Sequence, residues 1–187
     1  MTKKTKRIVG AAATGIVWLA CFAVAAAKAA PADGPELPGE CSELHNPEGT
    51  TLAFHVYATG DQIYRWNGTA WLLRAPDAKL YVNDRYEGLV GTHFAGPTWA
   101  SNSGSSVVAA RLKDCTPDAT AIPWLLLQKV VTDGPGIFSR VTHIQRVNTT
   151  GGLKPSSPGT TVGDELAVPY TAEYYFYRAT GPAEQSN

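Results

Sequence analysis

Turn-forming residues divide the chain beyond residue 29 into short apolar runs, and none of these runs has an apolar stripe at helical spacing. The clearest turn is Asn67-Gly68, because both residues tolerate positive φ and the dipeptide is a strong hairpin signal. It lies between residues 62–66 (QIYRW) and 70–74 (AWLLR). Before them, residues 51–58 alternate apolar and polar side chains, and Gly60-Asp61 predicts a further turn. These runs predict a meander of three strands.

Later runs extend the same pattern. Ala75-Pro76-Asp77 predicts a break after the meander, and Pro123 must lie at a strand start or a bulge, since proline cannot donate to a ladder. Residues 134–136 predict a turn and residues 149–164 a loop. Further strands are predicted over residues 80–82, 107–110, 122–127, 140–148 and 168–178. The fold class is therefore all-β: a single-domain β-sandwich or flattened β-barrel of about seven to ten short antiparallel strands.

Residues 1–29 have the pattern of a signal peptide. A basic region that includes Lys3 and Arg7 precedes an uncharged stretch over residues 8–27, and Ala27-Lys28-Ala29 offers small residues at the cleavage positions. We expect cleavage after Ala29 and a secreted or periplasmic protein. An uncleaved anchor is the alternative, since about 20 apolar residues can span a bilayer. A lipoprotein modified at Cys21 fits the spacing less well.

Cleavage changes the charge and cysteine counts. It removes five of the 16 basic residues and none of the 16 acidic ones, which leaves a mildly acidic chain without a basic cluster. Such a chain is a poor partner for nucleic acid or anionic membranes. Cys41 and Cys115 are the two cysteines that remain, and an even count in an exported protein predicts a disulfide, which would contribute roughly 4 kcal/mol.

The predicted organisation has four parts. After the signal peptide, residues 30–49 are rich in proline and glycine and predict an extended, exposed segment that is pinned at Cys41 if the disulfide forms. The all-β domain spans residues 50–180, and residues 181–187 are a C-terminal tail.

Residues 91–112 (GTHFAGPTWASNSGSSVVAARL) are the leading candidate for a site. Gly91, Gly96 and Pro97 bend the backbone around His93, and such corners cost regularity that a core strand does not need. The loop at residues 101–106 supplies hydroxyl groups with little bulk. The candidate ligand-binding residues are His93, Trp99, Ser105 and Tyr86.

Catalytic and cofactor signatures are weak. His55, His93 and His143 could hold a metal only if their strands were neighbours, since no two of them have a local ligand spacing. Ser105 could pair with His93, but the chain has no G-x-S-x-G elbow. Gly134-Pro135-Gly136 is not followed by the helix of a dinucleotide-binding loop. We therefore predict no catalytic residue, no metal and no cofactor.

Aromatic residues lie on both faces of several predicted strands, most clearly over residues 168–178. A small β domain needs only one apolar face on each strand, so some of these rings must be exposed, lie at an interface or line a groove. Exposed aromatic platforms of this kind can stack on sugars or other flat ligands.

Several runs resemble a family of secreted bacterial and fungal proteins known as domain of unknown function 3455. They are QIYRWNGTAW (62–71), GTHFAGPTW (91–99), IPWLLL (122–127), VTHIQRVNTTGG (141–152) and VPYTAEYYFY (168–177). The resemblance covers roughly residues 50–178 and implies no activity. Relatives often have a cysteine at the position of Trp66 and another in the 155–160 loop, so the second bridge that the resemblance implies is absent here.

The leading hypothesis is a monomeric, non-catalytic exported module that binds a small molecule, or a glycan or other envelope polymer, through residues 91–112. It would bind no nucleic acid and, after signal cleavage, no membrane. The alternative is a small secreted hydrolase or metal-dependent enzyme that uses His93. A purely structural envelope protein is the third reading.

Overall fold

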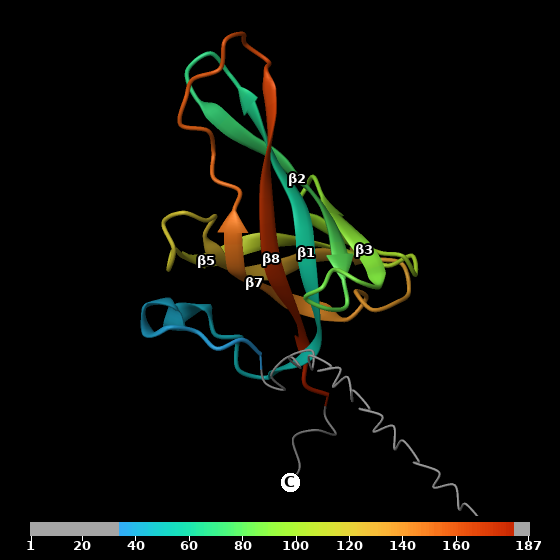
Figure 1. Ribbon diagram of the computed structural model, residues 1–187. Helices are drawn as coiled ribbons and strands as arrows, with labels where there is room; N and C mark the ends of the chain where they lie inside the picture. Colours follow the sequence, from blue (N-terminus) through green and yellow to red (C-terminus); the bar gives the residue numbers. More distant parts are fainter. Residues whose placement is uncertain (1–33, 182–187) are drawn as a thin grey trace, which may run out of the picture.

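The structure, a computed structural model, describes residues 34–181 as eight antiparallel strands in one closed barrel (Figure 1). Each strand pairs with the next in the chain, and β8 pairs with β1 to close the ring. The predicted signal peptide and nearly all of the predicted tail lie outside the described residues. The strands are β1 (Thr50–Trp66), β2 (Trp71–Tyr81), β3 (Leu89–Phe94), β4 (Thr98–Ser101), β5 (Ser106–Cys115), β6 (Trp124–Asp133), β7 (Val141–Gly151) and β8 (Glu165–Ala179).

The all-β prediction is confirmed, although several strands are longer than expected. Asn67-Gly68 does form the turn between β1 and β2: the side-chain Oδ1 of Asn67 accepts from the N–H groups of Thr69 (2.9 Å) and Ala70 (2.8 Å), and Gly68 has a φ of +97°. β6 begins at Trp124, directly after Pro123, as the proline required.

Two predicted interruptions are instead continuous strand. β1 runs straight through Gly60-Asp61, and Gly60 is needed because a Cβ there would collide with the carbonyl oxygen of Asp77 and with Ala78 on β2. β2 likewise runs through Pro76. At that position β2 pairs only with β1, since its pairing with β3 begins at Ala78, and proline is tolerated where one side of a strand has no neighbour.

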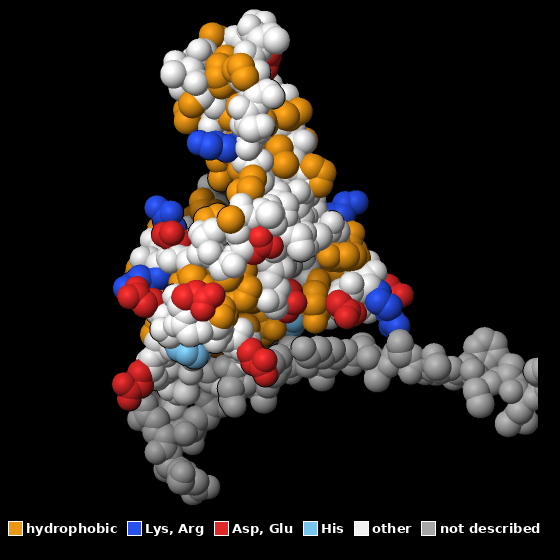
Figure 2. Space-filling view, turned by 60° about the vertical axis from the view of Figure 1, so that its left-hand side comes forward, with side chains coloured by type: hydrophobic (Ala, Val, Ile, Leu, Met, Phe, Trp, Pro, Cys, Tyr) orange, Lys and Arg blue, Asp and Glu red, His pale blue; other side chains and the backbone are white. Residues whose placement is uncertain are grey.

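Parts of β1, β2 and β8 extend beyond the barrel as a projection that we call the arm, residues 61–77 and 152–169 (Figure 1). It consists of the β1–β2 hairpin, the start of β8 and the loop that follows β7. Hydrophobic side chains remain exposed on it, among them Leu72, Leu73, Val162 and Leu166 (Figure 2). No helix within residues 34–181 is long and apolar enough to cross a membrane.

Aromatic side chains lie on both faces of β8 because both faces are covered. Tyr170, Tyr174 and Phe176 face the barrel interior and pack there with Trp99 and other apolar residues. The alternate residues, Tyr175 and Tyr177, belong to a second cluster on the outside of the barrel. The period of two along the strand therefore supplies two separate cores.

The outer cluster is covered by the N-terminal segment. Residues Gly39–Leu44 form a 3₁₀ helix, η1, whose Cys41 and Leu44 are fully buried against Trp124 and the outer tyrosines. This part of the segment is therefore helical rather than extended, in contrast to the expectation. Its other four residues are exposed, as expected: Gly39, Glu40, Ser42 and Glu43. The predicted disulfide between Cys41 and Cys115 is present, with a Cα–Cα distance of 5.5 Å.

Candidate functional site

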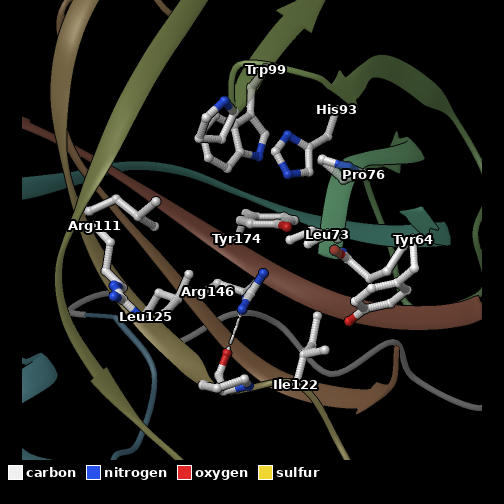
Figure 3. Close-up of a pocket in the computed structure, with 14 residues that line it drawn as sticks. Tyr64, Leu73, Pro76, His93, Trp99, Arg111, Ile122, Leu125, Arg146 and Tyr174 are labelled. Atoms are coloured by element: carbon white, nitrogen blue, oxygen red, sulfur yellow. Dashed lines mark hydrogen bonds between the residues drawn. The ribbon is translucent and has the colours of Figure 1, made fainter. Parts of the chain in front are cut away.

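A cavity of about 320 Å³ lies between the base of the arm and the barrel interior (Figure 3). Its walls come from strands that are far apart in the sequence: Gln62 and Tyr64 from β1, Leu73 and Pro76 from β2, His93 from β3, Trp99 from β4, Arg146 from β7 and Tyr174 from β8. Much of the remaining wall is apolar, with Ile122, Leu125 and Leu127 among its residues. The closed barrel thus creates a site that no single segment contains.

His93 and Trp99 form one wall as a stacked pair. They are opposite each other in the pairing of β3 with β4, and their ring centroids are 4.1 Å apart with an interplanar angle of 11°. Gly96, with a φ of +88°, allows the tight turn that brings the two strands together. Both side chains are buried, with exposed fractions of 3% and 1%.

His93 is neutral and has a defined tautomer. Its Nδ1 lies 2.8 Å from the carbonyl oxygen of Thr98, and since a carbonyl oxygen can only accept, Nδ1 carries the proton and Nε2 keeps a lone pair. Burial lowers the pKa of His93 to about 3; the hydrogen bond to Thr98 opposes this shift, and the positive charge of Arg146 adds to it. The ring therefore presents an acceptor, and no charge, at neutral pH.

Several buried donors around the cavity have no hydrogen bond of normal geometry within residues 34–181: the side-chain amide nitrogen of Gln62, the indole nitrogen of Trp99 and the hydroxyl groups of Tyr170 and Tyr174. Weaker hydrogen bonding still links Tyr170 with Gln62 and Tyr174, and Tyr174 with Arg146, and it affects the pKa values of the two tyrosines. The indole nitrogen of Trp99 has no such neighbour among the described residues. Burial is the main cause that raises the pKa of both tyrosines, so both hydroxyl groups keep their protons. Unpaired buried donors are rare in folded proteins, and each one costs about 1–3 kcal/mol.

Arg146 adds a positive charge to the same cavity. Its Nε and Nη2 donate to the carbonyl oxygen of Pro123 at 3.1 and 2.7 Å (Figure 3), and the side chain is half-buried. Within the described part of the chain no carboxylate pairs with Arg146. The other arginine of the cavity wall is Arg111, whose Nη1 lies 3.4 Å from Oδ1 of Asp114.

Of the four candidate residues from the sequence, the structure brings His93 and Trp99 together and places the other two elsewhere. Ser105 is buried, and its Oγ accepts from the N–H of Phe138 at 3.2 Å, which ties the 101–106 loop to the turn before β7. Tyr86 is 38% exposed in the turn between β2 and β3, with its ring against Tyr81. Neither residue lines the cavity.

The three histidines that were considered as metal ligands do not meet. The Nε2 of His55 lies 2.9 Å from a carboxylate oxygen of Glu173, and the ring stacks on Tyr175, which faces outward from the barrel. His93 faces the cavity, and His143 bonds only to the neighbouring Thr142. Among residues 34–181 no three potential metal ligands lie together.

Sequence reasoning missed Gln62, Tyr64, Arg146 and Tyr174. One signal was available. Arg146 is two residues from Ile144 on β7 and so lies on the same face of the strand, and Ile144 is fully buried in the barrel interior. A cation on the inward face of a strand is unusual, since charged groups are rarely buried without a partner. The other three residues belong to strands whose aromatic and polar residues gave no sign of which face lines a cavity.

Comparison with known protein families gives one match. A family model described as "Protein of unknown function (DUF3455)" matches residues 47–178, which include every strand from β1 to β7 and all of β8 except its last residue. No curated protein and no solved structure matches the chain.

Proposed function

Because the chain belongs to the DUF3455 family, whose description names no activity, we propose a function from the cavity itself: the protein is a non-catalytic module that binds a small molecule inside its barrel. The observation that carries this proposal is the set of cavity donors that have no hydrogen bond of normal geometry among the described residues, Gln62, Trp99 and Tyr174, in a wall that is otherwise largely apolar. A ligand with acceptor atoms would satisfy these groups, and an apolar pocket with a few convergent polar groups is the usual form of a small-molecule site.

The chemistry of the cavity wall supports binding rather than catalysis. A general base works best with a pKa near the operating pH, whereas the pKa of His93 is about 3. The wall contains no Ser, Thr, Cys, Lys, Asp or Glu side chain that His93 could activate. A hydrolase that uses His93 would therefore lack both an effective base and a nucleophile.

The shape of the site favours a small molecule over a polymer. Parts of all eight strands and of the connections between them surround the cavity, which has about the volume of a small ligand site. A glycan chain would need a groove that is open at both ends. We further propose that the protein acts outside the cytoplasm, because a disulfide such as Cys41–Cys115 is typical of oxidising compartments and residues 1–29 have the pattern of a signal peptide.

The test is a fragment screen against a pair of matched variants. Leu72 and Leu73 are neighbours on β2 and are both 54% exposed, but only Leu73 lines the cavity. Leu73→Trp should fill the cavity mouth, while Leu72→Trp adds the same bulk outside it. Ligand-observed NMR should detect fragments that bind the wild type and Leu72→Trp and that bind Leu73→Trp at least about tenfold more weakly. If no fragment shows this difference, the proposal is wrong.

A further inference from the structure

We propose that the ligand is an organic monocarboxylate, with its carboxylate held at Arg146 and a flat apolar body against the His93–Trp99 wall. This inference rests on the proposed function and names the ligand class for the same cavity. Two arginines line the cavity, and none of the residues in its wall is acidic. Arg111 has Asp114 as its partner, whereas Arg146 has no carboxylate partner within residues 34–181.

Arg146 is held in a position that leaves donors free. Its two bonds to the carbonyl oxygen of Pro123 fix the plane of the guanidinium group. A guanidinium group has five N–H donors, so donors remain beyond the two that the carbonyl oxygen accepts and the one that faces the hydroxyl of Tyr174. A carboxylate fits such a group well, because it can accept two parallel N–H bonds and supplies the opposite charge.

The charge of Arg146 reaches the groups around the cavity. Burial is the main cause that raises the pKa of Tyr64, Tyr170 and Tyr174, and the guanidinium charge opposes that rise. Burial is also the main cause that lowers the pKa of His93, and there the guanidinium charge adds to the shift. The free-energy cost of moving an anion from water into this cavity would therefore be offset by its attraction to Arg146, which the low local dielectric screens poorly.

Polar groups lie next to Arg146 and could turn toward a ligand. The hydroxyl of Tyr174 has weak hydrogen bonding with Arg146 and with Tyr170, and Tyr170 has weak hydrogen bonding with Gln62, none of it with normal geometry. Each of these groups can donate, and a carboxylate group only accepts. The positive charge of Arg146, which has no carboxylate partner among residues 34–181, matches one negative charge, whereas a phosphate dianion would leave a buried charge without a partner.

The opposite wall fixes the orientation of the ligand. His93 presents the lone pair of Nε2 there, which repels an anion, and its ring lies parallel to that of Trp99 (Figure 3). Ile122 and Leu125 lie on the side of Arg146 instead (Figure 3). A flat apolar body suits the side of His93 and Trp99, and the carboxylate must then point away from His93 and toward Arg146.

The test compares 2-naphthoate with 2-naphthamide, which differ in charge and have nearly the same shape. Isothermal titration calorimetry should show that the wild type binds the naphthoate at least about tenfold more tightly. Arg146→Gln should remove that preference, and Arg146→Lys should retain part of it. Arg85→Gln, which changes an exposed arginine that pairs with Glu87 outside the cavity, should leave it unchanged. Circular dichroism and the melting temperature confirm that each variant is folded.

The outcomes separate this inference from the proposed function. Equal affinity for the two probes, or an equal loss of preference in Arg146→Gln and Arg85→Gln, would overturn the inference. If Leu73→Trp nevertheless weakens the binding of both probes, the cavity is still the ligand site and only the anionic class is wrong. No binding of the naphthoate at millimolar concentration also overturns the inference, while the fragment screen tests the cavity independently.

Discussion

The imidazole of His93 lies parallel to the indole of Trp99, with ring centroids 4.1 Å apart, and the hydroxyl-bearing ring of Tyr174 meets both of them edge-on. The stack buries the histidine completely enough to keep it neutral far below its usual pKa. A buried histidine that stays neutral affects the pH dependence of stability, because between the two pKa values its imidazole binds a proton in the unfolded chain but not in the folded chain.

The first prediction concerns acid pH. Since the pKa of His93 falls from 6.5 unfolded to about 3 folded, the unfolded state binds more protons between these values, and stability should fall as the pH falls through this window. His93→Gln should make the unfolding free energy less dependent on pH between 6.5 and 4, by up to about 1.4 kcal/mol per pH unit. Urea unfolding at a series of pH values measures this. The wild type and His93→Gln have the same carboxyl groups, so the contribution of these groups to the pH dependence of stability cancels in the comparison.

His143→Gln is the control for that experiment. Burial also lowers the pKa of His143, but this side chain is only partly buried, so its effect should have the same sign and a smaller size. Parallel curves for the wild type and His93→Gln would show that His93 is protonated in the folded protein.

The second prediction concerns the polar connection beneath η1. The hydroxyl of Tyr177 donates to Oε1 of Gln145, and Nε2 of Gln145 donates to the carbonyl oxygen of Leu44. All three residues are buried, so Tyr177→Phe leaves Oε1 unpaired and should cost about 1–3 kcal/mol. Tyr175→Phe is the matched control: its hydroxyl bonds to the partly exposed Glu173, which keeps His55 as a partner, and the loss there should be smaller. Denaturant unfolding compares the two, and equal losses would contradict the prediction.

The third prediction tests the contact between β1 and β2. A Cβ at Gly60 would collide with backbone atoms of Asp77 and Ala78, so Gly60→Ala must push the strands apart and should cost about 1–3 kcal/mol. Gly39→Ala is the control, since a Cβ there meets nothing within 4 Å. Thermal unfolding measures the stability of both variants. A Gly60→Ala variant as stable as the wild type would show that the strands can accommodate a Cβ without moving apart.

The fourth prediction concerns the disulfide. Replacing both Cys41 and Cys115 by alanine should lower the unfolding free energy by roughly 4 kcal/mol, the value for a closed loop of 74 residues. Hydrogen exchange should show faster exchange in η1, because the bond ties it to the end of β5. Reductant should reproduce the effect in the wild type and have none on the double variant. Equal stability with and without reductant would mean that η1 is held by packing alone.

The fifth prediction concerns processing. If the first 29 residues are a signal peptide, the mature protein should begin at Ala30. Intact mass of the exported protein checks this directly. Retention of residues 1–29 would favour an anchor instead.

The sequence was a good guide wherever the cause of a structure is local. Asn67-Gly68 forms its turn because of the φ values that the two residues tolerate, and Pro123 precedes its strand because it cannot donate. Gly60 and Pro76 carry the same local signals, yet both lie inside strands. Glycine is required at position 60 because the neighbouring strand is too close for a Cβ, and proline is permitted at position 76 because β2 has no neighbour there on the β3 side. Both causes depend on tertiary structure and not on the local sequence.

The cavity could be predicted only in part, for a related reason. His93 and Trp99 are six residues apart on one hairpin, so the sequence placed them together. Arg146 and Tyr174 join them only because β7 and β8 complete the ring. Ser105 had the right chemistry for a site, but its hydroxyl is used to hold Phe138.

The pairing of Thr50 with Ala179 at the seam between β1 and β8 also determines when the protein can fold during its synthesis. A chain that a ribosome has extended only to the end of β7 has seven strands and two open edges, and unpaired edges recruit other chains. The final strand of 15 residues closes the seam and covers both edges at once. We therefore expect a chain truncated before β8 to leave two edges unpaired and to be degraded instead of forming a smaller stable domain.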